Sequence, residues 1–293
     1  FTGSPLGTAV DPLAHIVTGA LVFRSVGPFA RRRVAPSVLA CGVLMATCGP
    51  DLDILFPVLG LRGWVFQHRA FTHSVLGGAA WACVLAAGFW GAVQIAHRKS
   101  GPFQEYALAG VLGTWLHILG DWGTSYGTPL LWPFSRGEFS LDLISNLDLF
   151  YGGALAISVV VAAELARRSR AGHASAIRLT SFAAALLYVG VGFWGREAAL
   201  RDGAVASFPA FESPAVRRLV YPEGTGYRLV RKNLVTGGEW ERHVDLRPDY
   251  SDPVVRASAE APEVTRLLKH ARFPVIRIRR EGGGTTVWWT DLL

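Results

Sequence analysis

A histidine and an aspartate stand four positions apart in the segment HILGD, at His117 and Asp121. On a helix, residues at this spacing lie one turn apart on the same face, so an imidazole nitrogen and a carboxylate can bind one cation. The spacing also fits an aspartate that caps the helix beside a histidine bonded elsewhere. The positions of the other histidines and aspartates must decide between these interpretations.

Further residues of the same two types precede this pair. They are His15, Asp51, Asp53, His68 and His73. Each has a purely structural interpretation: a histidine near a helix start, a GPDLD turn that ends a helix, and the interfacial loop HRAFTHS. Ionisable side chains are costly at a lipid bilayer and usually mark function there. What matters is therefore where the apolar segments place them.

The composition indicates a membrane protein. Of the 293 residues, 51% are hydrophobic and 17% are charged, and the mean hydropathy is +0.30. The apolar segments cover about residues 12–29, 34–48, 73–96, 103–120, 147–166 and 176–195. Several approach the ~20 residues that cross a bilayer and two are short, so the expected fold is mainly α, a polytopic membrane bundle of about six helices.

Basic residues predict the orientation of this bundle. Clusters follow the first, third and fifth apolar segments: Arg31 to Arg33, Arg98 with Lys99, and Arg167 with Arg168 and Arg170. Cytoplasmic loops are enriched in Lys and Arg, so these ends are predicted to be cytoplasmic. All the histidines and aspartates named above then fall on the outer face, which favours one shared site.

The last third of the chain has a different composition. Residues 1–198 hold 24 charged side chains, whereas the 95 residues of 199–293 hold 27. We therefore expect a membrane helical domain at 1–198 and an extracytoplasmic soluble domain at 199–293. The net charge of +7 is divided as +4 and +3 between these parts, so no nucleic-acid partner is expected.

Alternating strand-like runs predict a small α+β fold for the soluble domain. Glycine-rich turns separate the runs Tyr227–Asn233, Glu239–Leu246, Phe273–Arg280 and Thr285–Leu292. One helix is expected near residues 262–271. The predicted structure is an antiparallel sheet packed with a helix, and its residues show no catalytic constellation.

The order of the motifs resembles a known family. LAHIVTGAL, PDLD, HRAFTHS and HILGDWGTSYGT follow one another as in the YdjM-type predicted membrane-bound metal-dependent hydrolases of bacteria and archaea. The resemblance covers roughly residues 11–150 by motif and is weaker beyond them. It implies an integral protein of the bacterial or archaeal plasma (inner) membrane. More remotely, the order is similar to the secreted zinc-dependent phospholipases C and the related single-strand nucleases.

Carried over to this chain, the resemblance implies a site with two metal ions bridged by Asp121. The implied ligands are His15, Asp51, one of His68 or His73, His117 and Asp121. The phospholipases also use their N-terminal amine as a ligand, and the second histidine of HRAFTHS is expected to replace it. Gly127 stands where they have a histidine for a third zinc, and no HxxxE follows. That third ion is not expected unless Asp142 or Asp148 supplies oxygen ligands.

The chemistry of such a site is phosphoester hydrolysis. Imidazole and carboxylate ligands suit zinc, with manganese or iron as alternatives. A pair of divalent cations lowers the pKa of water and neutralises a departing oxygen. Asp53 is the candidate for the base or for a residue that orients a ligand. Arg69 is the candidate for a phosphate contact, unless it only anchors a helix at the interface.

The predicted location also indicates the substrate. A site at the water–lipid boundary suggests a membrane lipid or a lipid-linked phosphate, and the long loop from Trp122 to Asn146 is expected to form a pocket wall. Two other classes remain open: a transporter that relays ions through His and Asp, and a scaffold with a structural metal. Clustering at one face disfavours the relay. Open coordination positions would separate the enzyme from the scaffold.

Overall fold

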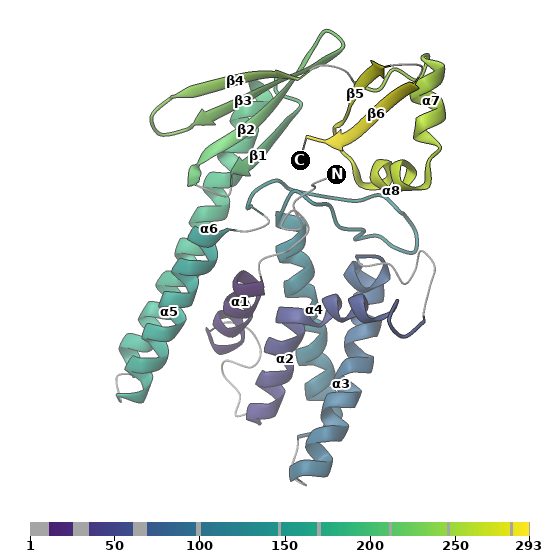
Figure 1. The fold of residues 1–293 in the computed structure, drawn as a ribbon. Helices are drawn as coiled ribbons and strands as arrows, with labels where there is room; N and C mark the ends of the chain where they lie inside the picture. The colour runs from purple at the N-terminus through teal and green to yellow at the C-terminus, as the bar shows by residue number, and fades with distance from the viewer. Residues whose placement is uncertain are drawn as a thin grey trace. The chain divides into compact units, whose positions relative to one another are not determined.

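The chain folds into two units that meet within a helix (Figure 1). A computed structural model describes residues 12–25, 35–60, 69–97, 101–145, 148–168, 171–210, 213–244, 247–281 and 284–292. Residues 1–191 form the helical unit and residues 192–293 contain the sheets. The sequence places this boundary at residue 198. The division falls earlier because the last turns of the helix pack on a sheet, where Ala199 contacts Leu219 and Val230.

Each of the apolar segments forms a helix, as predicted. The helices are α1 (Pro12–Ser25), α2 (Pro36–Cys48), α3 (Val75–His97), α4 (Phe103–Gly123), α5 (Leu149–Arg167) and α6 (Ala171–Arg201). Two short 3-10 segments, η2 (Pro50–Leu55) and η4 (Phe71–His73), precede α3. Among the described residues, only α3, α5 and α6 are long and apolar enough to cross a membrane. Candidate spans are thus fewer than helices: α1 and α2 are short, with 14 and 13 residues, and α4, with 21 residues, is not among the candidates.

Small residues bring α2 and α4 into close contact. A Cβ atom at Gly113 would lie 2.2 Å from the carbonyl oxygen of Gly42, so the two backbones approach more closely than side chains would allow. Met45 and Tyr106 pack around this contact in the core of the unit. One turn beyond Gly113, the close approach places the ring of His117 against α2.

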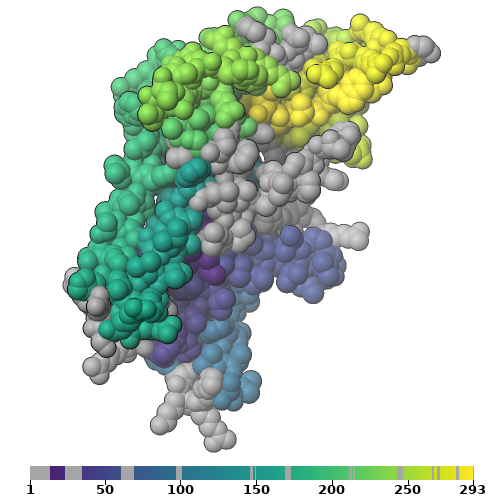
Figure 2. Space-filling view, turned by 60° about the vertical axis from the view of Figure 1, so that its left-hand side comes forward, coloured from purple at the N-terminus to yellow at the C-terminus, as the bar shows by residue number. Residues whose placement is uncertain are grey.

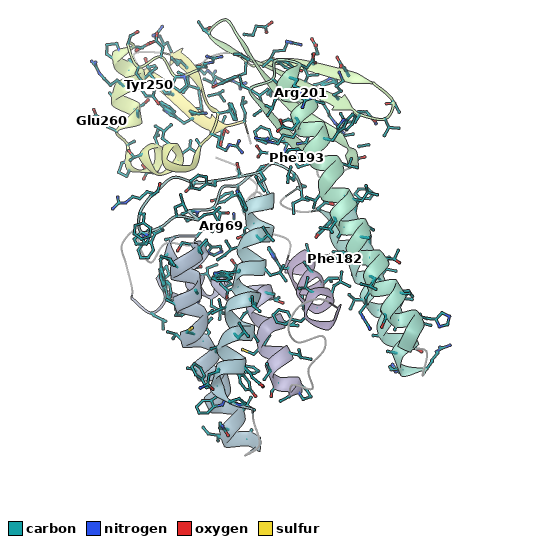
Figure 3. The ribbon with its side chains drawn as sticks, turned by 180° about the vertical axis from the view of Figure 1, so that it is seen from behind. Arg69, Phe182, Phe193, Arg201, Tyr250 and Glu260 are labelled. Atoms are coloured by element: carbon teal, nitrogen blue, oxygen red, sulfur yellow. The ribbon has the colours of Figure 1, made fainter. Side chains whose placement is uncertain are left out.

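The helices α5 and α6 lie side by side and form one continuous teal column in the space-filling view (Figures 1 and 2). Leu155 of α5 packs with Leu21 of α1, and Phe182 of α6 joins this cluster from the side of α6 that faces α1 (Figure 3). The Tyr188 hydroxyl donates a hydrogen bond of 2.7 Å to Asp148, whose carboxylate also caps α5. α1, α5 and α6 are thereby held together.

The C-terminal unit contains two antiparallel sheets. The first, in the order β1-β2-β3-β4, consists of β1 (Ala206–Ala210), β2 (Ser213–Glu223), β3 (Gly226–Asn233) and β4 (Glu239–Val244). The second is the hairpin of β5 (Pro274–Glu281) and β6 (Gly284–Asp291), preceded by α7 (Pro253–Ala259) and α8 (Pro262–His270). The predicted strands and helix are confirmed. β1, β2 and α7 were not predicted, and the strands divide between two sheets.

Candidate metal centre

The ends of several helical segments bring most of the predicted ligands together. The residues are His15 of α1, Asp51 of η2, His73 of η4, and His117 and Asp121 of α4. His68 lies outside the described residues. The ligand atoms form two overlapping groups, His15–His117–Asp121 and Asp51–His73–His117, and within each group they lie within 4.8 Å of one another.

Asp121 is the centre of this cluster. Its Oδ1 atom lies 3.4 Å from Nε2 of His15 and accepts a hydrogen bond of 3.1 Å from Nη2 of Arg69. Its Oδ2 atom lies 3.4 Å from Nε2 of His73 and 3.6 Å from Nε2 of His117. The two oxygens of this buried carboxylate therefore face different histidines, which is the arrangement that a bridging ligand requires.

Asp51 lies on the accessible side of the cluster. Its Oδ1 atom is 3.1 Å from Nε2 of His73 and 3.5 Å from Nε2 of His117. The Asp51 side chain is 33% exposed, whereas both imidazoles are fully buried. Burial disfavours the charged carboxylate, yet the neighbouring imidazoles of His117 and His73 outweigh it and hold the pKa of Asp51 well below its usual range.

The His117 ring is oriented by α2. Its Nδ1 atom lies 3.2 Å from the carbonyl oxygen of Ala46, so a neutral ring carries its proton there and leaves the Nε2 lone pair for a cation. His15 stacks on this ring with the centroids 4.1 Å apart. The stack depends on Gly120, because a Cβ atom at that position would lie 2.8 Å from Cε1 of His15.

Asp53 lies beneath His73 and is fully buried. Its Oδ2 atom accepts hydrogen bonds from the Thr72 hydroxyl at 2.5 Å and from the backbone N–H of Arg69 at 3.2 Å. The same oxygen is 3.5 Å from Nδ1 of His73. A carboxylate behind an imidazole fixes its orientation and raises its basicity. Two roles were predicted for Asp53, a general base and a residue that orients a ligand. This position favours the second role, in which Asp53 orients His73.

Arg69 contacts the cluster through an unusual backbone conformation. Its φ angle is 59°, in the left-handed region that non-glycine residues rarely adopt. This conformation directs the guanidinium over the ring of Tyr126, at 4.6 Å from the centroid, and onto Asp121. The Nη1 atom is buried without a hydrogen-bond partner in the described protein. Such strain is found where a side chain is held for function.

The side chains present fit a divalent metal. Nε2 of His117 and Oδ2 of Asp121 are buried and have no hydrogen-bond partner among the described residues, although buried polar atoms are normally paired. Three carboxylates face one guanidinium, so with neutral histidines the cluster carries a net charge of −2. Uncompensated charge of this kind is costly to bury. A cation between these atoms would accept the lone pairs of His117 and Asp121 and would neutralise the negative charge.

The two carboxylates considered for a third ion lie outside these groups. Asp148 caps α5 by accepting a hydrogen bond from the backbone N–H of Tyr151 at 2.9 Å. Asp142 is buried in the loop after α4, with a φ angle of 55°. Within the described residues, the candidate ligands are therefore limited to the two overlapping groups that contain Asp121 and Asp51.

An apolar cavity of about 400 Å³ adjoins the cluster. Its wall on the cluster side includes His15, Gly120 and Thr124, and the remainder is mostly aliphatic and aromatic. The loop that the sequence predicts as a pocket wall contributes Leu141, Leu143 and Ile144. Sequence reasoning missed the contribution of α5 and α6, including Leu155 and Phe182. It also missed Gly120 and Thr72, although both stand directly beside predicted ligands.

The fold and the cluster define a polytopic membrane protein with a buried His/Asp site. A family model described as "YdjM inner membrane protein" matches residues 10–199, more than half of the chain, and the chain belongs to this family. The family expected from the motifs is thus confirmed, and the matched range includes the whole cluster.

One relative adds to this comparison. Over 116 residues the chain is 28% identical to YfhP, an uncharacterized protein of Bacillus subtilis (strain 168), and the match covers 38% of this chain and 34% of that protein. The chain therefore spans about a third of the length of this relative. No solved structure matches the chain.

Proposed function

We propose that this protein is a membrane-bound metal-dependent hydrolase that cleaves a phosphoester in a lipid or lipid-linked phosphate. The observation that carries the proposal is a pair of buried atoms, Nε2 of His117 and Oδ2 of Asp121, that have no hydrogen-bond partner among the described residues, in a cluster that an apolar cavity adjoins. The first feature calls for a cation, and the second calls for a hydrocarbon group close to it.

The ligand atoms suffice for two ions, with zinc favoured and manganese or iron as alternatives. An imidazole nitrogen offers one lone pair, so His117 can serve only one ion although it belongs to both ligand groups. We assign it to one ion, which Asp51 and His73 would also hold. His15 and Asp121 would then hold the other ion.

The protein side chains have separable roles in the proposed reaction. When bound, divalent metals at such a site acidify a water molecule and neutralise charge on the phosphoester. Arg69 would bind a phosphate oxygen through Nη1, which has no partner in the described protein. Asp53 would hold His73 in position through Thr72, whose hydroxyl donates to Oδ2 of Asp53 at 2.5 Å and lies 3.0 Å from Nδ1 of His73. Asp51, as the exposed ligand, would face the entering substrate.

The apolar cavity supports a lipid substrate. A volume of about 400 Å³ lined mostly by aliphatic and aromatic residues suits a hydrocarbon chain, which gains about 0.8 kcal/mol for each CH₂ group that it buries. His15 lines this cavity and also contacts Asp121 at 3.4 Å. A chain in the cavity would therefore place its phosphate group beside the cluster.

Basic residues support an extracytoplasmic site. Arg167 and Arg168 are exposed at the end of α5 that lies opposite to Asp148. Asp148 lines the same cavity as His15, so the cluster is at the other end of α5 from these arginines. Under the positive-inside rule, the arginine end would be cytoplasmic and the cluster would be extracytoplasmic.

The first test is the metal content of the purified protein, measured by plasma mass spectrometry. Wild type is compared with His117→Ala and Asp121→Ala, with His173→Ala as a matched control because His173 is exposed and lies outside the cluster. Hydrolysis of a phosphodiester, a phosphomonoester and lipid phosphates is assayed on the same samples. Size-exclusion profiles report whether each variant is folded.

We expect about two metal equivalents in wild type and in the control, as two-ion sites require, and loss of metal and hydrolysis together in both cluster variants. Folded wild type that binds no metal would overturn the proposal and favour the ion relay. Metal without hydrolysis of any substrate would favour the structural scaffold.

A second variant tests the lipid substrate. Ala185→Phe adds a ring inside the cavity, where Ala185 packs near Leu155. We expect hydrolysis of long-chain lipid phosphates to fall while hydrolysis of a water-soluble phosphoester is retained. Ala92→Phe adds the same volume at an exposed position of α3 and serves as the control. Equal effects on both substrates would contradict the proposal that the lipid chain binds in the cavity.

A further inference from the structure

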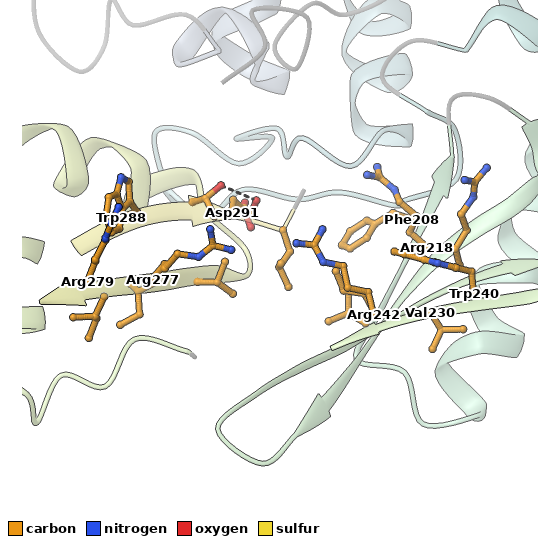
Figure 4. Close-up of a pocket in the computed structure, with 17 residues that line it drawn as sticks. Phe208, Arg218, Val230, Trp240, Arg242, Arg277, Arg279, Trp288 and Asp291 are labelled. Atoms are coloured by element: carbon orange, nitrogen blue, oxygen red, sulfur yellow. Dashed lines mark hydrogen bonds between the residues drawn. The ribbon is translucent and has the colours of Figure 1, made fainter. Parts of the chain in front are cut away.

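The C-terminal unit contains a second cavity, of about 1040 Å³, between its two sheets (Figure 4). Strands β1 to β4 line one side and the β5–β6 hairpin lines the other. We call this cavity the arginine cleft, after the lining residues Arg218, Arg231, Arg242, Arg277 and Arg279. The family match ends at residue 199 and so does not include it.

The strand register gathers arginines on one face of the four-stranded sheet. Arg218 stands directly opposite Arg231, which in turn stands opposite Trp240. Arg242 pairs with Leu229, two positions along β3, and so shares this face. Like charges directly opposite one another destabilise a sheet. The placement of these arginines therefore does not stabilise the sheet, and it indicates a role in binding.

Acidic residues of the same strand are directed to the opposite face. Glu239 and Glu241 alternate with Trp240 and Arg242 along β4. Glu241 forms an ion pair with Arg228 at 2.9 Å, and Glu239 forms one with Lys232 at 2.6 Å. One face of the sheet therefore has balanced charge, whereas the face toward the arginine cleft has an excess of positive charge.

The hairpin presents a matching face. Ile276 and Trp289 pack with Val255 of α7, which leaves Arg277 and Arg279 on the alternate positions that line the cleft. Figure 4 shows Arg242 and Arg277 extending from the two sheets toward the space between them. Within the described part of the chain, neither of these two arginines forms an ion pair, while Arg279 pairs with Glu281.

The single carboxylate in the lining is already engaged. Asp291 accepts hydrogen bonds from the backbone N–H groups of Arg272 at 3.0 Å and Phe273 at 2.9 Å. It thus serves the local fold of the hairpin. Five arginines against one aspartate give the described lining of the cleft a net charge of +4.

We infer that the arginine cleft binds a phosphate-bearing anion. Guanidinium groups form paired hydrogen bonds with phosphate oxygens, and a phosphate can accept such bonds from both walls at once. Four residues separate the end of α6, a candidate membrane span, from β1, so membrane lipid headgroups are one source of the phosphate. Trp240 and Trp288, both exposed in the cleft, are of the type enriched at lipid headgroups. A water-soluble phosphate is the other source.

Calorimetric titration of the full chain in a neutral detergent tests this inference. The probes are inorganic phosphate and dihexanoylphosphatidylglycerol, and a chelator is present throughout so that the metal centre does not contribute. The double variant Arg242→Gln/Arg277→Gln removes one guanidinium from each wall. Arg256→Gln/Arg280→Gln removes the same charge outside the cleft and is the matched control. Arg256 is exposed, and among the described residues Arg280 forms a single ion pair, with Asp252.

We expect binding of at least one probe, about tenfold or more weaker in the cleft variant and unchanged in the control, as loss of charge-assisted contacts predicts. The probe that binds identifies the source of the phosphate. Binding of neither probe, or equal weakening in both double variants, would overturn the inference. Because the metals are removed, either result is independent of the proposed hydrolase activity.

Discussion

Replacing Gly120 with alanine is expected to displace His15 from the proposed metal centre while leaving the fold intact. The new Cβ atom would lie 2.8 Å from Cε1 of His15 and 3.1 Å from its Nδ1. Carbon atoms in contact normally lie about 3.5–4.0 Å apart, so the imidazole must move by roughly 0.7–1.2 Å. Metal–ligand distances are held within about 0.2 Å, and a shift of this size breaks such a bond.

The effect on folding should be small, because two contributions oppose each other. Overpacking costs about 1–3 kcal/mol, whereas alanine is favoured over glycine in a helix by about 1 kcal/mol. The clash also falls on the far end of a side chain rather than on a backbone. We therefore expect metal affinity to fall about tenfold or more, with a thermal unfolding temperature close to that of wild type.

The assay is metal content by plasma mass spectrometry after equilibration with graded chelator. Gly91→Ala in α3 is the matched control, since a Cβ atom there meets no atom within 4 Å. It should retain metal and gain slightly in stability. A Gly120→Ala protein that binds metal as tightly as Gly91→Ala would refute the assignment of His15 as a ligand.

Three further substitutions test the surroundings of the site. Thr72→Val removes the 2.5 Å hydrogen bond to Asp53 and should lower the free energy of unfolding by about 1–3 kcal/mol, while Thr72→Ser should preserve it; equal stability of the two variants would count against this bond. Gly113→Ala places Cβ 2.2 Å from a backbone oxygen of α2 and should abolish recovery of folded protein by size exclusion, unlike Gly91→Ala. Tyr188→Phe loses the 2.7 Å bond to Asp148 and should cost about 1 kcal/mol in thermal unfolding, with metal content unchanged; a loss of metal would contradict this separation.

The helices and the cluster could be predicted because their signals are strong. Apolar segments of about the right length predict membrane helices directly. His117 and Asp121 stand out because ionisable residues are rare in such segments. Their mutual distances could not be predicted, since these depend on the close approach of α2 and α4 at Gly42 and Gly113. The sequence likewise left the role of Asp53 open between a general base and a residue that orients a ligand. Its buried position beside His73 favours the orienting role.

Other features left no distinctive signal. The cavity is lined by residues such as Leu155 and Phe182, which resemble any other residues of an apolar helix. β1 and β2 contain Pro209 and Pro222, and proline argues against a strand assignment. The helix α7 has only 7 residues, too few for a clear periodicity, although Asp252 and Pro253 mark its start.

The shortness of α2 bears on the depth of the proposed reaction site. A helix of 13 residues is about 20 Å long, roughly 10 Å less than the hydrocarbon thickness of a bilayer. If α2 begins at one boundary, then Asp51, which follows its last turn, lies at the level of the acyl chains. A lipid could reach such a recessed site by lateral diffusion and would not have to be extracted into water. A chain of 16 carbons would otherwise pay on the order of 13 kcal/mol for that transfer.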